Sequence, residues 1–104
     1  MTLENIKALL DTTGFPVAYN HFKSRVAFPF ICYMADSSDN FHADNKVYKE
    51  IQHLRIELYT KQKDLISENK LKQALDGFSW EQVSETYIND SNEKYYQIIY
   101  EMEI

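Results

Sequence analysis

The segment FPFICYMA, residues 28–35, is apolar on both sides of the strand that it predicts. Successive side chains of an extended chain point to opposite sides, so alternate residues share a side. One side carries Phe28, Phe30, Cys32 and Met34, and the other carries Pro29, Ile31, Tyr33 and Ala35. Because both sides of such a strand need cover, the segment predicts one of two arrangements. It is either a central strand covered on both sides or a strand covered on one side by a neighbouring subunit.

Two segments have the apolar spacing of amphipathic helices. In residues 3–12, leucine and isoleucine recur at helical intervals, and Thr2 precedes them as the predicted N-cap. A second helix is expected to follow Lys61–Asp64 and to run to about Asp76. Its apolar positions are Leu71, Ala74, Leu75 and Phe78. Gly14 and Gly77 are the predicted stops, because glycine readily adopts the left-handed conformation that ends a helix.

The remaining elements are predicted strands. Residues 17–22 alternate and end in a polar turn at Lys23–Arg25, and residues 46–60 alternate for long enough to predict one extended strand. In that strand Leu54, Ile56 and Leu58 face inward, and His53, Arg55 and Glu57 face the other way. Residues 80–88 and 94–104, joined by a polar turn, predict a hairpin.

This pattern predicts a single domain over residues 1–104 with an α+β fold. We expect an antiparallel sheet of about five strands with two helices packed on one face, in the order α-β-β-β-α-β-β. Residues 36–45 are polar and turn-rich, with Phe41 as their one large apolar residue, and are expected to form a loop or arm. Aromatic residues make up 14% of the chain, and eight of them are Tyr, a residue that is enriched where surfaces meet a partner.

Charge and cysteine content narrow the class of function. The formal net charge is -5, which opposes sequence-independent binding to nucleic acid, since that binding is driven by cations on phosphate. A single cysteine cannot form an internal disulfide, which favours a reducing, intracellular compartment. The first 25 residues lack the pattern of a signal peptide, and no apolar run is long enough to cross a membrane. We therefore expect a soluble protein that is made in the cytoplasm and does not bind membranes.

The residues that suggest chemistry have simpler explanations. Cys32 lies on an apolar strand, which raises the pKa of a thiol instead of activating it, so it is interpreted as a buried apolar side chain. His21, His42 and His53 do not have the spacing of a metal site, and His42 is interpreted as a loop histidine. We predict no catalytic residues, no metal and no cofactor, and hence no enzyme. Replacing Cys32 by serine tests this, because loss of function without loss of folding would revive an enzyme.

Glu101 and Glu103 stand two apart near the end of the last predicted strand. They share a face opposite Tyr100, Met102 and Ile104, which is the alternation of a half-buried strand. Paired carboxylates serve acid–base chemistry only in a pocket that separates their pKa values. We interpret this pair as the polar face of the strand.

Five segments together resemble a known class of proteins. They are PVAYNHF at 16–22, PFICYM at 29–34, NFHADNKVY at 40–48, IELYTKQKD at 56–64 and YQIIYEMEI at 96–104. In these segments the chain resembles the small head-to-tail joining proteins of long-tailed bacteriophages and prophages, and tail terminator or tail-completion proteins in particular. The segments span nearly the whole chain in order, and none of them is a chemical signature. Chain length and the order of helices and strands agree with that family.

The resemblance implies a structural role. Members of this class form a ring, commonly hexameric, that caps the tail tube and joins it to the head connector. The implied partners are therefore further copies of the chain, the major tail protein and head-connector proteins, while DNA passes through without specific binding. The implied location is the host bacterial cytoplasm during assembly and then the virion. The candidate contacts to subunits or partners are Phe41, His42, Tyr48 and Tyr33, and the candidate acidic residues of the pore are Glu101 and Glu103.

Two alternatives stay open at this point. Within the same class, the chain is a head-closure or connector protein, one position nearer the capsid. From a different class, it is a small acidic inhibitor or immunity-type binding module, which is also compact, acidic and aromatic.

Overall fold

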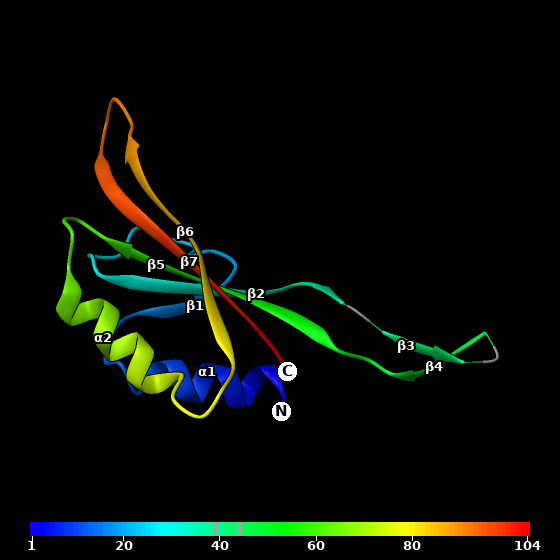
Figure 1. Cartoon of the computed structure of the whole chain (residues 1–104). Helices are drawn as coiled ribbons and strands as arrows, with labels where there is room; N and C mark the ends of the chain where they lie inside the picture. The colour runs from blue at the N-terminus through cyan, green and yellow to red at the C-terminus, as the bar shows by residue number, and fades with distance from the viewer. Residues whose placement is uncertain (39, 44) are drawn as a thin grey trace.

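The fold is α+β and is built around a five-stranded sheet. The computed structural model describes residues 1–38, 40–43 and 45–104. Its elements are α1 (Leu3–Asp11), β1 (Val17–Tyr19), β2 (Phe30–Ser38), β3 (Phe41–Ala43), β4 (Lys46–Lys49), β5 (Gln52–Thr60), α2 (Leu65–Ala74), β6 (Trp80–Asn89) and β7 (Lys94–Glu103). The main sheet has the strand order β1-β2-β5-β7-β6, and β3 and β4 form a separate two-stranded sheet (Figure 1). The predicted class and the five main strands are confirmed.

Local signals place both helices close to their predicted bounds. Thr2 caps α1 in a reciprocal capping box, in which its hydroxyl accepts from the Asn5 amide at 3.1 Å and Asn5 accepts from the Thr2 amide. Asp64 caps α2 and accepts from the Ser67 amide at 3.0 Å. Gly14 and Gly77 follow the two helices with φ of 82° and 91°, so these residues adopt the left-handed conformation expected of them.

The sheet is mixed because its first strand is parallel to the second. Val17 pairs with Ile31 and Tyr19 with Tyr33, in parallel register, whereas all other neighbouring strands of the main sheet are antiparallel. The predicted strand over residues 17–22 ends at Tyr19, and the next residue, Asn20, has φ of 66°. The chain then crosses over through residues 20–29 before β2 begins. A purely antiparallel sheet was expected from the hairpin-like pattern, which carries no signal for this crossover.

The predicted long strand over residues 46–60 is two strands, β4 and β5, separated at Glu50–Ile51. In β5, Leu54, Ile56 and Leu58 are completely buried, as predicted. The opposite side of β5 differs from expectation, because Glu57 there is only 6% exposed. The register between β2 and β5 shifts between Ala35 and Ser37, which marks a β-bulge at the end of the sheet where β2 leaves it.

One face of the sheet and both helices enclose the hydrophobic core. We call this face of the sheet the helix face. Its buried side chains come from β2, β5 and β7, and they form one cluster with Ile6 and Leu10 of α1 and with Leu71 and Leu75 of α2. Figure 1 shows both helices below the sheet. The core therefore lies on one side of the sheet, and no described side chain between residues 34 and 53 belongs to it.

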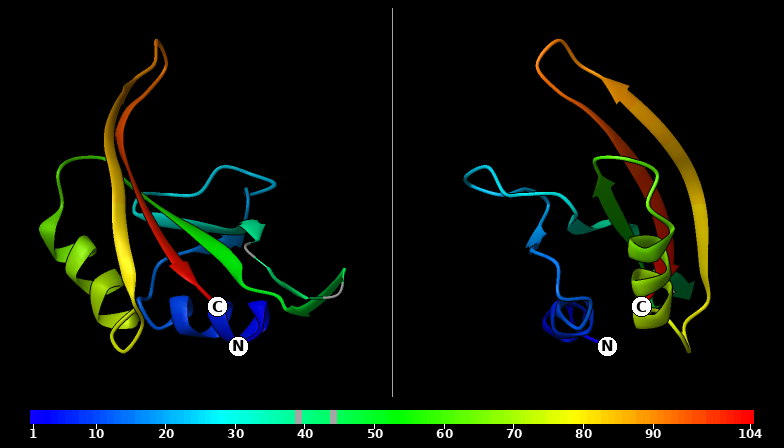
Figure 2. Two further views of the ribbon diagram at one scale, coloured as in Figure 1. Left: turned by 45° about the vertical axis from the view of Figure 1, so that its right-hand side comes forward. Right: turned by 90° about the vertical axis from the view of Figure 1, so that its left-hand side faces the viewer.

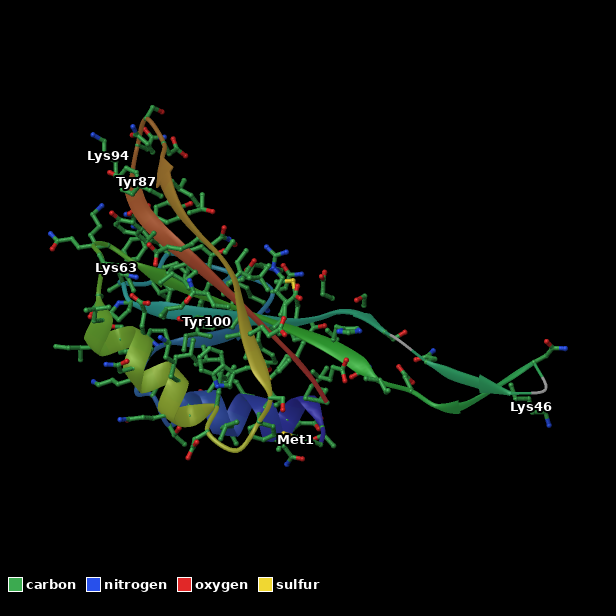
Figure 3. All side chains as sticks on the ribbon, viewed as in Figure 1. Met1, Lys46, Lys63, Tyr87, Lys94 and Tyr100 are labelled. Atoms are coloured by element: carbon green, nitrogen blue, oxygen red, sulfur yellow. The ribbon has the colours of Figure 1, made fainter. Side chains whose placement is uncertain are left out.

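Two β-ribbons extend away from the core. The first, residues 36–50, contains the end of β2 and the pair β3–β4, and we call it the arm (Figure 1). Lys46 lies at its far tip (Figure 3). The second is the distal half of the β6–β7 hairpin, which rises past the other strands in both views of Figure 2. The molecule is accordingly elongated, with principal extents of 52 × 28 × 24 Å.

Candidate interaction surface

The second face of the sheet, opposite the helices, carries the features that most resemble a binding surface. We call it the rear face. Its side chains come from the three central strands: Phe30, Cys32 and Met34 on β2, Arg55, Glu57 and Tyr59 on β5, and Gln97, Ile99 and Glu101 on β7. No helix among the described residues contributes to this face. The crossover segment, residues 20–29, lies over one end of it and is its cover within the described part of the chain.

Five aromatic rings gather at that end of the rear face. The ring of Phe30 stacks on Tyr59 with centroids 4.8 Å apart, and the rings of Phe22 and Phe28 lie 5.5 and 5.1 Å from Phe30. Tyr95 completes the set at 5.6 Å from Phe28. These rings border a hollow of about 450 Å³, which we call the aromatic groove. A hollow of this size, lined by aromatic side chains and open to solvent, is typical of a binding site.

The rim of the aromatic groove is basic. Lys23 and Arg25 of the crossover segment line it, and the Arg25 guanidinium pairs with Glu93 while its side chain stays 78% exposed. The Lys61 ammonium lies 5.7 Å from the centre of the Phe28 ring, in a cation–π contact. The groove therefore offers apolar surface in its floor and positive charge at its edge.

A hydrogen-bonded network holds the floor of the groove in place. Arg55 donates from Nε to the Glu57 carboxylate at 3.0 Å, and the Tyr59 hydroxyl donates to the same carboxylate at 3.2 Å. Gln97 donates to the Tyr59 hydroxyl at 2.9 Å. Burial raises the pKa of Tyr59 to about 12, against the lowering effect of the Gln97 hydrogen bond. Glu57 is buried and ion-paired, which accounts for an acidic residue in the middle of the central strand.

Cys32 lies in the lining of the groove, next to Glu57 on the neighbouring strand. It is a free thiol and only 5% exposed, as its apolar strand predicts. Burial, and secondarily the negative charge of Glu57, raise the pKa of the Cys32 thiol to about 11. Such a thiol is almost wholly protonated near neutral pH, and a protonated thiol is a poor nucleophile. His21 also lines the groove, whereas the side chain of His42 lies outside the described part of the chain.

The opposite end of the rear face is acidic. In the strand register, Glu101 lies opposite Arg55 of β5 and opposite Glu81 of β6, and Glu103 lies opposite His53 of β5. The flanking Tyr100 and Met102 are buried on the helix face, so the predicted alternation of this strand is confirmed. Glu101 is half-buried and Glu103 is exposed. Their placement in a pore stays a prediction.

The predicted contact residues fall into two groups. Phe41 and His42 lie on β3 and Tyr48 on β4, so the structure places their backbone in the arm, but their side chains are outside the described residues. Asp39 and Asp44 lie wholly outside them. Tyr33 belongs to the hydrophobic core, where its ring meets Tyr19 edge-to-face at 5.2 Å. Tyr33 is only 6% exposed, so its side chain packs in the core of its own subunit, and its contact with a partner stays a prediction.

A second cluster of charges ties α2 to the sheet on the helix face. The Lys63 ammonium lies 2.8 Å from a carboxylate oxygen of Glu68 and 2.5 Å from one of Glu85, so it links α2 to β6 (Figure 3). Hydrogen bonds to these two carboxylates raise the pKa of Lys63. Glu68 is only 3% exposed, and burial together with its charge raises the pKa of the nearby Tyr100 to about 12. This cluster stabilises the fold and faces no hollow of the rear face.

The aromatic groove was not predicted as a site. Three of its rings, Phe22, Phe28 and Phe30, belong to segments interpreted as strands, and Tyr59 and Tyr95 lie far away in sequence. The signal that points to it is the two-sided apolar strand over residues 28–35, which requires cover on its second side. The sequence left open whether that cover comes from the same chain or from a neighbouring subunit.

No protein-family model and no curated protein sequence matches this chain. Within residues 1–38, 40–43 and 45–104, no three His, Cys, Asp or Glu side chains are grouped so that they could hold a metal ion. In the same residues, neither α1 nor α2 has the length and apolar character of a membrane-spanning helix.

Proposed function

We propose that this protein is a structural component of a phage virion, a tail terminator that forms a ring at the head–tail junction. The observation that carries the proposal is the arm, a β-ribbon that projects from the core and adds none of its described side chains to it. The order of helices and strands agrees with the class that the five sequence segments resemble. A projecting ribbon and an uncovered sheet face are what a subunit needs to bind copies of itself and neighbouring proteins.

In this role the chain acts by shape and contact. A ring caps the end of the tail tube, stops further addition of the major tail protein and presents its other side to the head connector. A closed ring also covers the sheet edges that each subunit leaves open at β1 and β6. Glu101 and Glu103, with Glu81 beside them, are proposed to line the pore, where carboxylates repel the phosphates of passing DNA.

Electron microscopy of phage that lack this protein tests the proposal. We expect intact heads separated from tails, or tails of uncontrolled length, because nothing caps the tube or joins it to the head. Virions of normal appearance would refute the proposal. A ring structure in which Glu101 and Glu103 face outward would refute the assignment of the pore alone.

The two alternatives make different predictions. A head-closure or connector protein of the same module would leave tails of normal length that fail to join filled heads. An acidic inhibitor or immunity-type protein would stay monomeric and bind a basic enzyme. Light scattering at increasing concentration separates this second case, since particles of ring size favour the junction protein.

A further inference from the structure

We infer that the aromatic groove of one subunit receives the arm of a second copy, so that subunits join head to tail. This inference rests on the proposed function for its biological role, because it names the contact that builds the ring. Its evidence is the placement of the two features, the exposure of the arm and the charge of both segments.

The groove and the arm lie at opposite ends of the same strands. Phe30 at the start of β2 and Tyr59 near the end of β5 belong to the groove, whereas Ser38 and Gln52, which pair with each other, lead into the arm. From Phe30 to Ser38 an extended strand covers roughly 26 Å, at about 3.3 Å per residue. An arm that points away from its own groove cannot fill it. Only another copy can bring an arm to that position.

Among the described residues, the arm has no strand partner outside itself beyond β2 and β5 at its base. Its strands β3 and β4 pair only with each other in the described part of the chain, in a register of three residue pairs. An isolated two-stranded hairpin is marginally stable in water, because it buries too little surface to offset the lost chain entropy. A hairpin of this kind gains stability when it docks on a surface, and the aromatic groove is an open hollow on the rear face.

The charges of the two segments are opposite. The crossover segment over the groove, residues 20–29, contains Lys23 and Arg25 and no acidic residue, for a net charge of +2. Glu93, which also lines the groove and pairs with Arg25, lowers the net charge of these three residues to +1. The arm, residues 36–50, contains four acidic and two basic residues, for a net charge of -2. Complementary charge of this kind orients two surfaces and speeds their encounter. It also disfavours groove-to-groove and arm-to-arm pairing.

A contact between two different surfaces has a defined outcome. Each subunit uses its arm once and its groove once, so the chain of contacts continues until it closes on itself. The result is a ring when the geometry closes and a filament when it does not. A symmetric dimer, which pairs like with like, is not built by this contact.

Two variants that each lack one half of the contact test the inference. The groove variant combines Lys23→Glu with Arg25→Glu, both on exposed side chains of the crossover segment. The armless variant replaces residues 39–51 by Asn-Gly, a two-residue turn that suits the paired residues Ser38 and Gln52. Neither change touches the hydrophobic core. Circular dichroism and thermal unfolding establish that both variants fold.

Sedimentation velocity then measures mass. We expect the wild-type protein to associate as its concentration rises and each variant alone to stay monomeric under the same conditions. An equimolar mixture should form a one-to-one dimer and stop there, because one partner still has an arm and the other still has a groove. The matched control, Lys70→Glu with Lys72→Glu on α2, makes the same change in net charge and should associate like the wild type.

Three results would overturn the inference. They are a wild-type protein that stays monomeric up to about 1 mM, an armless or groove variant that assembles like the wild type, and a mixture that stays monomeric. Each of them leaves the proposed function to be decided by electron microscopy of the virions. Conversely, normal virions without the protein, together with a dimer in the mixture, would overturn the function and keep the contact.

Discussion

At the scale of single residues, the rear face shows how one buried carboxylate organises its surroundings. Glu57 holds Arg55 and Tyr59 through direct hydrogen bonds and lies beside Cys32 on the next strand. Its charge adds to burial in keeping the Cys32 thiol protonated. In the lining of the aromatic groove, Tyr59 is thus fixed by hydrogen bonds and the Cys32 thiol is kept in its less reactive, protonated form.

The raised pKa of Cys32 predicts a loss of stability at alkaline pH. Folding raises this pKa from 9.0 to about 11, so between these values the unfolded thiol ionises while the folded thiol keeps its proton. The contribution of the Cys32 thiol to the free energy of unfolding is complete below the pKa of the unfolded state and is lost as pH rises toward the pKa of the folded state. Between about pH 8 and about pH 10 the loss amounts to roughly 1 kcal/mol.

Urea denaturation of the wild type and of Cys32→Ser over this pH range measures the effect. Serine does not titrate, so the stability advantage of the wild type should shrink as pH rises. Tyr59 and Tyr100 also have raised pKa values and are present in both proteins. Tyr100 cancels in the difference, and the shift of Tyr59 comes mainly from burial, with the charge of Cys32 as its smallest cause. A difference that stays constant with pH would contradict the prediction.

At the scale of elements, the Lys63 cluster is the connection that fixes α2 against the hairpin. The lysine lies in the loop before the helix, pairs with a buried carboxylate on the helix and reaches a third element, β6. An exposed pair between Lys7 and Asp11 lies within α1 and connects nothing. Exposed ion pairs contribute little to the free energy of unfolding. Removing the cation that pairs with a buried carboxylate destabilises the fold much more.

We predict that Lys63→Met loosens α2 and β6 together. Glu68 would lose its cation while it is still buried, and β6 would lose its link to the helix. Hydrogen exchange should then speed up at the first turn of α2 and around Glu85, and less in β5. Lys7→Met is the control, with faster exchange expected only near the end of α1. Equal effects of the two variants on α2 would contradict the prediction.

At the scale of the whole molecule, the chain is polarised along its strands. One end carries the aromatic groove with its basic rim, and the other end carries the acidic arm with Glu101 and Glu103 near its base. The charges at the two ends are opposite, so copies of the chain could join end to end through one kind of contact. The charges of the crossover segment and of the arm cancel in the sum. The net charge of the chain therefore does not reveal this polarity.

The polarity predicts that association weakens with salt. Raising ionic strength from about 50 mM to about 500 mM screens the attraction between groove and arm. Sedimentation velocity of the wild-type protein at both salt concentrations measures the shift toward monomer. Lys70→Glu with Lys72→Glu should keep the same salt response, because these residues lie on the helix side. Association that strengthens with salt would indicate a purely apolar contact instead.

Local structure could be predicted from the sequence because its causes are local. Several predictions depend only on neighbours within a few residues. They are the cap at Thr2, the helix stops at Gly14 and Gly77, and the hairpin after Trp80. The buried side of β5 likewise followed from its alternation. The α+β class follows from these elements and is confirmed.

The features that the sequence did not predict depend on residues that lie far apart in the chain. The parallel pairing of β1 with β2 is decided by where residues 20–29 cross, and no periodic pattern records that path. The burial of Tyr33 in the core depends on which side of β2 the helices cover, and the alternation of the strand does not tell this. The aromatic groove combines segments more than seventy residues apart, from Phe22 to Tyr95, so only their meeting in the fold reveals it.

The β-bulge between Ala35 and Ser37 has a consequence for the size of the ring that we propose. It bends β2 where the strand leaves the body, so it sets the direction in which the arm points. In a head-to-tail assembly every subunit repeats that direction, and the turn from one subunit to the next fixes the circumference. In the proposed ring, backbone geometry at this one position would set the curvature, and the groove would set the affinity. An insertion or deletion at the bulge would alter the number of subunits while leaving each contact intact.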